Sequence, residues 1–202
     1  MFGGDKVAAA TMMGIWGTTF NALAMISIPG VLWVSRHVGK HRAIMIALGM
    51  VCISAALKFV LYTPEAPYLQ MLIALLHAPG LAAYLVLVNS MTADIVDYDE
   101  SLNGERREAL IAAANTWITK TGVSLSFIFA GLVLNMTDFD AAKITQEPDT
   151  VLGMRICFSA IPVAGTLLGL VVLRSYPLSK QKVGEIQAFN EERRTLAAAA
   201  TS

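Results

Sequence analysis

Charged side chains of both signs gather in residues 89–121, between two strongly apolar stretches. The first apolar stretch ends in four carboxylates, which are Asp94, Asp97, Asp99 and Glu100. A short polar segment with two arginines follows, and the next apolar stretch opens on another acid: Arg106, Arg107 and Glu108. Carboxylates at the C-terminal end of a helix are disfavoured by the helix dipole, so these acids need cationic partners. The pattern therefore predicts an ion-pair network between helix ends.

Three further cations could join this network from the basic loop of residues 35–42, namely Arg36, Lys40 and Arg42. Two interpretations stay open: a solvated loop that only fixes the topology, or a gate whose ion pairs break when one part of a helical bundle rocks against another. A calcium loop is a third interpretation, because Asp97, Asp99 and Glu108 fit the first, third and twelfth positions of an EF-hand. We reject it because Leu102 occupies the sixth position, where the sharp turn needs glycine, and we expect no metal site.

Lys120 is the second candidate for chemistry, because it lies in the middle of an apolar run. Counted from Leu110 at about 1.5 Å per residue, it lies about 15 Å into a hydrocarbon core roughly 30 Å thick. A charge at that depth costs at least about 2.5 kcal/mol, so it should face a polar cavity or pair with an acid. None of the expected membrane spans contains Asp or Glu. We therefore expect its counter-charge to come from outside this chain, or from a second copy.

Other polar residues at depth are weaker candidates for a substrate or cation pathway. Some surround Lys120 and the rest lie in two other apolar runs: Asn115, Thr116, Thr119, Trp16, Asn21 and His77. Threonine and asparagine in such runs more often hydrogen-bond between helices than contact a ligand. Trp16 could stack on a sugar ring or could pack against neighbouring helices. For His77 two roles stay open, that of a hydrogen-bonded structural residue and that of a residue lining a cavity. Lys58 lies near the end of the apolar run of residues 43–61, and we expect its ammonium group to reach the membrane–water interface.

The composition indicates a polytopic membrane protein. Hydrophobic residues make up 55% of the 202 residues and charged residues 15%, with a mean hydropathy of +0.59. The formal net charge is zero, so there is no basic surplus for binding nucleic acid. An intramembrane enzyme is not expected, because the spans hold neither a zinc-protease motif nor a pair of buried carboxylates. No cofactor is expected either.

The apolar runs predict an all-α integral membrane protein with five transmembrane helices. Each run reaches the roughly 17 residues that a bilayer core requires, with spans at about 7–33, 43–61, 68–93, 110–134 and 156–173 and a tail at 177–202. We expect a kink near Pro29 and an interruption at Pro79 and Gly80. Ten lysines and arginines lie on one side of the membrane against three on the other. The positive-inside rule then places the basic loops and the C-terminus in the cytoplasm and the N-terminus outside, in a cell membrane.

Residues 91–126 resemble the region of the tenth and eleventh helices of glycoside–pentoside–hexuronide:cation symporters, the melibiose-permease-like branch of the major facilitator superfamily. Three parts carry the resemblance: the acid-rich ADIVDYDE of residues 93–100, the GERRE of residues 104–108, and Lys120 in the following helix. The SRHVGKHR loop of residues 35–42 resembles the basic loop between helices eight and nine of the same carriers.

This resemblance implies that the five spans correspond to helices eight to twelve of a twelve-helix carrier of sugars or glycosides, coupled to Na⁺ or H⁺. In that family, acids of the first half hold the cation and much of the sugar, so we expect a missing N-terminal half as a partner beside the lipid bilayer. Lys120 matches the family lysine of the cation and sugar region. Two alternatives stay open: a remnant or accessory protein without transport of its own, and a related carrier of lipid-like substrates. We expect the tail to be a solvated surface helix.

Overall fold

The computed structural model describes residues 6–62, 66–143 and 146–201, and all regular structure in these ranges is helical. The elements are α1 (Lys6–Val38), α2 (Lys40–Leu61), the short 3-10 helix η1 (Pro67–Leu69), α3 (Gln70–Asn103), α4 (Glu108–Met136), α5 (Pro148–Arg174) and α6 (Lys180–Thr201). Helices α1 to α5 are long and apolar enough to cross a membrane. The expected all-α fold with five membrane-spanning helices is therefore confirmed for the described part of the chain.

Three prolines lie inside continuous helices of the described chain, and the third is Pro162 in α5. α1 runs through Pro29 and α3 runs through Pro79, so the interruption expected in the third span is wrong. A proline removes one N–H donor, and in hydrocarbon no water can replace the remaining backbone hydrogen bonds, so the helix keeps them. Gly80 instead allows α3 to approach α2 closely. A Cβ atom there would lie 2.9 Å from Val51 Cγ2 and 3.0 Å from the Ala47 carbonyl oxygen.

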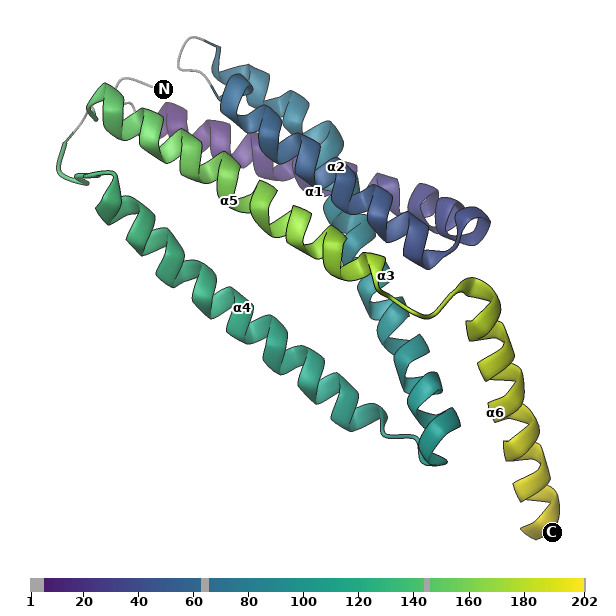
Figure 1. The fold of residues 1–202 in the computed structure, drawn as a ribbon. Coiled ribbons are helices and arrows are strands. Elements are labelled where there is room, and N and C mark those ends of the chain that lie inside the picture. The colour runs from purple at the N-terminus through teal and green to yellow at the C-terminus, as the bar shows by residue number, and fades with distance from the viewer. Residues whose placement is uncertain (1–5, 63–65, 144–145, 202) are drawn as a thin grey trace.

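Four of the spans form a packed group (Figure 1). α2 packs against α3 on one side and α5 on the other, and α1 packs mainly against α3. The centre of the group is rich in alanine, with Ala43, Ile44, Ala47, Ala83, Leu87 and Met91. Lipid tails are as apolar as these side chains, so helices in a bilayer associate through close packing of small residues rather than through the hydrophobic effect. The small side chains explain why α2 and α3 are the most buried spans.

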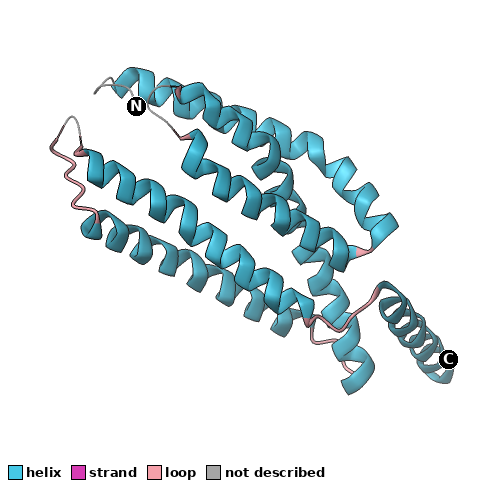
Figure 2. Ribbon diagram, turned by 45° about the horizontal axis from the view of Figure 1, so that its top comes forward, coloured by secondary structure: helices cyan, strands magenta, loops and turns pink. Residues whose placement is uncertain are grey.

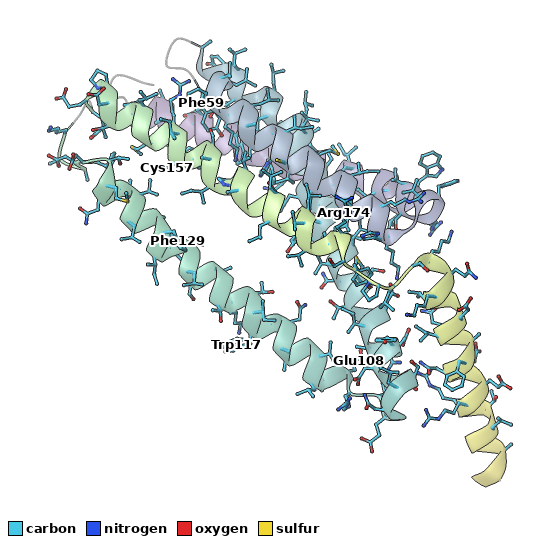
Figure 3. All side chains as sticks on the ribbon, viewed as in Figure 1. Phe59, Glu108, Trp117, Phe129, Cys157 and Arg174 are labelled. Carbon is cyan, nitrogen blue, oxygen red and sulfur yellow. The ribbon has the colours of Figure 1, made fainter. Side chains whose placement is uncertain are left out.

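α4 is the exception to this packing. It runs alongside α5 but apart from the other helices, joined to them by the connections at its two ends (Figures 1 and 2). None of its residues is buried. Trp117, labelled on α4 in Figure 3, is 70% exposed. Both the apolar and the polar side chains of α4 are therefore available to lipid or to further parts of an assembly.

α3 is longer than a bilayer requires. Its 34 residues extend over about 51 Å, against a hydrocarbon core of roughly 30 Å. The last turns therefore project beyond the packed group, and α6 lies beside them (Figure 1). α3 stops at Gly104, whose φ of 79° gives the left-handed cap that glycine adopts without strain. We call this end of the molecule, where residues 36–42, 94–108 and 174–194 lie, the basic end.

Candidate functional site

A partly buried ion pair joins the start of α2 to α3 at the basic end. The Lys40 ammonium lies 2.7 and 2.8 Å from the two carboxylate oxygens of Asp94, which is 4% exposed. The same ammonium donates to the Ser90 carbonyl oxygen at 3.4 Å. A carboxylate this deeply buried needs a partner, because an unpaired buried charge is strongly destabilising. The pair therefore constrains how α2 and α3 meet at this end.

The two arginines after α3 fold back onto its acids. Arg106 donates to Asp97 at 3.1 Å, to Glu100 at 3.2 Å and to Glu108, the first residue of α4, at 3.1 Å. Arg107 makes two bonds to Asp99, at 2.6 and 2.9 Å. The hydrogen bonds and charge of Asp99 raise the pKa of the Arg107 guanidinium above its ordinary value. The segment between α3 and α4 is therefore held against α3 by charge-assisted bonds.

α6 contributes residues to this network that the sequence did not suggest. Arg194 donates to Glu100, with Nε 2.9 Å from Oε1, and this contact raises the pKa of the Arg194 guanidinium. Asn190, which is buried, donates to the Asp97 backbone oxygen at 2.7 Å. Gln187 donates to the Asp97 carboxylate at 3.1 Å. The tail helix is therefore docked on α3 through these three side chains, while most of its other side chains are exposed, as expected of a surface helix.

The remaining basic residues of the expected network lie outside it. Arg36 and Arg42 are exposed, and within the described ranges neither forms an ion pair. The ion pairs of the described chain thus include eight of the ten expected residues and add Arg194. Among the described residues, no cluster of three or more His, Cys, Asp or Glu side chains could hold a metal ion.

Replacing Glu100 by glutamine is expected to release α6. The amide keeps the shape of the side chain but removes the charge that Arg106 and Arg194 share. Trypsin should then cleave after Lys182 roughly fivefold faster than in the unmodified chain, the effect of losing a partly exposed ion pair. Glu192→Gln, the same change on the exposed surface of α6, is the matched control and should leave the cleavage rate unchanged. Equal rates in the two variants would show that this contact does not hold the tail.

The four polar candidates on α4 share one side of the helix. At 100° per residue, Asn115, Thr116, Thr119 and Lys120 fall within about 140°. Thr119 donates to the Asn115 carbonyl oxygen of the preceding turn at 2.8 Å. Thr116, Thr119 and Lys120 are exposed and Asn115 is half-exposed. Lys120 forms no ion pair with any described residue.

Trp16 and His77 come together through Phe20 at the contact of α1 and α3. The Trp16 ring stacks on Phe20 with centroids 5.1 Å apart, and Phe20 lies 5.9 Å from the His77 ring. His77 Nδ1 lies 2.7 Å from the Ser54 hydroxyl of α2. Asn21 is exposed and donates to the Gly17 carbonyl oxygen of its own helix at 2.8 Å. These contacts favour packing roles for the ring side chains over a direct role in binding substrate.

We expected Lys58 to reach the membrane–water interface, but its side chain is buried between helices. It is 8% exposed, and its ammonium lies 4.8 Å from the centroid of the Phe158 ring of α5. One turn away, Arg155 lies over the Phe59 ring of α2 at 5.4 Å and donates to the Phe59 carbonyl oxygen. Two reciprocal cation–π contacts therefore join α2 and α5, and such contacts strengthen when water is excluded.

A comparison with known proteins identifies the family of this chain. The model of the family described as MFS/sugar transport protein matches residues 2–180, which include all five membrane-spanning helices. The chain belongs to this family. The expected resemblance to cation symporters of the major facilitator superfamily is thereby confirmed, and α1 to α5 are part of a transporter fold.

Three of the relatives of the chain are carriers of two kinds. It is 27% identical over 173 residues to the sodium-dependent lysophosphatidylcholine symporter 1-B of Danio rerio, covering 84% of this chain and 33% of the relative. It is 26% identical over 159 residues to the sphingosine-1-phosphate transporter MFSD2B of Xenopus tropicalis, covering 78% and 30%. It is 27% identical over 107 residues to the glucuronide carrier protein homolog of Escherichia coli K12, covering 53% and 23%. The chain thus spans about a third or less of the length of these relatives.

Proposed function

We propose that this chain forms helices eight to twelve of a secondary carrier that moves sugars or glycosides together with Na⁺ or H⁺. The observation that carries the proposal is Lys120, a charge in the middle of an apolar span with no acid partner in the described chain. A charge at such a depth is characteristic of a transport pathway, because the bilayer tolerates it only beside a polar cavity or a counter-charge. The family description and the glucuronide carrier relative support the substrate class.

In this proposal the polar side of α4 borders the pathway. Lys120 would meet an acid of the first half of the carrier across the pathway, and Asn115, Thr116 and Thr119 would contribute hydrogen-bonding groups beside it. No residue of α4 is buried in the described structure, which supports this placement. α1, α2, α3 and α5 would move as one body, in agreement with their close packing.

The network at the basic end would act as the gate of this carrier. We place the basic end and the C-terminus in the cytoplasm and the N-terminus outside, in a cell membrane, on the strength of the lysine and arginine distribution. Alternating access rocks one repeat against another, so ion pairs at helix ends must form and break in each cycle. The contacts of Arg106 with acids of both α3 and α4 suit that task, because they link the end of one helix to the start of the next.

A carrier of lipid-like substrates is the second candidate. The lysophosphatidylcholine and sphingosine-1-phosphate relatives favour it, because they match more of this chain than the glucuronide carrier does. The apolar side of α4 also suits an acyl chain, with Trp117 and Ile128 largely exposed. A chain without transport of its own is the third candidate, and it differs from both in giving no uptake.

Uptake into vesicles separates these candidates. Vesicles holding the chain alone, or the full carrier that contains it, receive an inward Na⁺ or H⁺ gradient and a radiolabelled substrate. We expect the full carrier to accumulate a glycoside such as melibiose or methyl glucuronide above its external concentration, and to stop when the gradient is collapsed. Accumulation of lysophosphatidylcholine but of no glycoside would contradict the sugar assignment and support the lipid one. No gradient-dependent uptake of either substrate would contradict both.

A further inference from the structure

A cavity of about 670 Å³ opens at the basic end, beside the ion-pair network. Its walls come from the connection between α1 and α2, from α3, from the segment after α5 and from the first turn of α6. Four cationic side chains line it, namely Arg36, Lys40, Arg42 and Lys180. Asp94 is the one acid in the lining, and Lys40 already neutralises it. The cavity therefore carries a surplus of positive charge.

Among the described residues, two of these cations have no acidic partner for their charge. Arg36 and Arg42 are exposed and lie without an ion pair in the described ranges. The Lys180 ammonium reaches the cavity from α6 and donates to the Arg36 carbonyl oxygen at 2.8 Å. This bond holds the start of α6 against the end of α1, so the tail helix closes one wall of the cavity.

The cavity also lies at the N-terminal ends of two helices. α2 begins at Lys40, after Gly39 with φ 86°, and its first turn contains neither an acid nor a capping side chain. α6 begins at Lys180, also without an acid in its first turn, and the Ser179 hydroxyl accepts a bond only from the Lys182 backbone N–H, at 3.3 Å. First-turn N–H groups and the helix dipole both favour a bound anion.

A buried hydroxyl supplies a further, independent observation. Tyr176 lines the cavity, and its hydroxyl oxygen is buried without a hydrogen-bond partner in the described structure. Burial and the nearby Asp94 carboxylate raise the pKa of Tyr176 to about 12, so the hydroxyl keeps its proton. His41, whose ring lies 5.8 Å from that of Tyr176, is already engaged by the Leu173 carbonyl oxygen at 2.8 Å. A buried hydroxyl without a hydrogen-bond acceptor costs free energy, and a ligand that accepts its hydrogen bond removes this cost.

We propose that this cavity binds the phosphate headgroup of an anionic phospholipid from the adjoining leaflet. The cavity lies where α1 ends, α2 begins and α5 ends, which is the level of the headgroups for helices that cross the bilayer. Arg36 and Arg42 would contact the phosphate, and the Tyr176 hydroxyl would donate to one of its oxygens. Basic pockets between helix ends bind headgroups of this kind. The site is separate from the substrate pathway proposed along α4, so it does not depend on what the carrier moves.

The test titrates the purified chain, in detergent, with phosphatidylglycerol or with phosphatidylcholine of the same acyl chains, and counts bound lipids by native mass spectrometry. We expect the chain to prefer phosphatidylglycerol. Arg36→Gln with Arg42→Gln should weaken phosphatidylglycerol binding about 25-fold, since each basic side chain near an anionic headgroup contributes roughly a fivefold factor. Tyr176→Phe should weaken it roughly tenfold, because one hydrogen bond to a charged group is lost. Both variants leave the ion-pair network intact, so folding is preserved.

Arg174→Gln with Arg193→Gln is the matched control, because it removes two exposed charges of the basic end that do not line the cavity. Weakening equal to that of the Arg36 and Arg42 variant would show diffuse attraction and overturn the proposal. Full binding by Tyr176→Phe, or equal binding of the two lipids, would also overturn it. A separate arm adds inorganic phosphate alone. Saturation of the site by inorganic phosphate below about 1 mM, without preference for phosphatidylglycerol, would show that the ligand is a free anion.

Discussion

Lys120→Ala is expected to abolish gradient-driven uptake by the full carrier while leaving its amount in the membrane unchanged. The charge lies near the middle of the bilayer on the polar side of α4. A charge at that depth is stable only beside an aqueous pathway or a counter-charge. Lys120 is exposed and forms no ion pair with a described residue, so we expect its removal to leave the helix bundle intact. Uptake into vesicles, divided by the amount of carrier on an immunoblot, measures the effect.

Two variants control this experiment. Lys120→Arg keeps the positive charge and should retain part of the uptake. Ile118→Ala changes a side chain at nearly the same depth, about 160° away around the helix, and should retain uptake in full. Normal uptake by Lys120→Ala would remove the lysine from the mechanism.

Gly80→Ala is expected to have the largest effect on stability. Its Cβ would lie 2.9 Å from Val51 Cγ2, 3.0 Å from the Ala47 carbonyl oxygen and 3.3 Å from Met50 Cβ. The nearest atoms include backbone of α2, so α2 and α3 must move apart and lose contacts at the centre of the packed group. Overpacking of this kind costs about 1–3 kcal/mol. Unfolding of the purified chain in mixed micelles, followed by circular dichroism, measures the change in free energy.

Gly49→Ala is the matched control for this substitution. It introduces the same methyl group inside α2, where no atom lies within 4 Å of the new Cβ. Because alanine has the higher helix propensity, this variant should be as stable as the original chain or slightly more so. A Gly80→Ala variant that is as stable as Gly49→Ala would show that α2 and α3 do not approach each other at this point.

The number of spans could be predicted because the thickness of a bilayer sets the length of each apolar run. The helix ends could not, since nothing in the hydrophobic pattern stops a helix once it leaves the membrane. α3 continues through its acids to Asn103 because Arg106, Arg107 and Arg194 neutralise them. The continuity through Pro79 was missed for a related reason, because a bilayer preserves the hydrogen bonds around a proline.

The ion pairs at the basic end could be predicted where the two charged residues are close in the sequence. Arg106 and Arg107 meet acids less than ten positions away. Arg194 meets Glu100 across 94 positions, and no periodic pattern reports a contact of that kind. Its one signal was the run of charges in residues 191–194, which resembles any solvated helix surface. The position of Lys58 was predicted wrongly because the partner of its ammonium is the Phe158 ring. A phenylalanine in an apolar run has no charge, so the sequence does not indicate that it pairs with a lysine.

The central claim is that the polar side of α4 borders an aqueous transport pathway. With Cys52 and Cys157 replaced by serine, one cysteine is placed at position 120 or at position 118, and the full carrier in membranes is treated with a small, charged, membrane-impermeant thiol reagent. We expect the cysteine at position 120 to react, while the cysteine at position 118, on the opposite side of α4, stays unreactive. Reaction at position 118 with none at position 120 would contradict the claim.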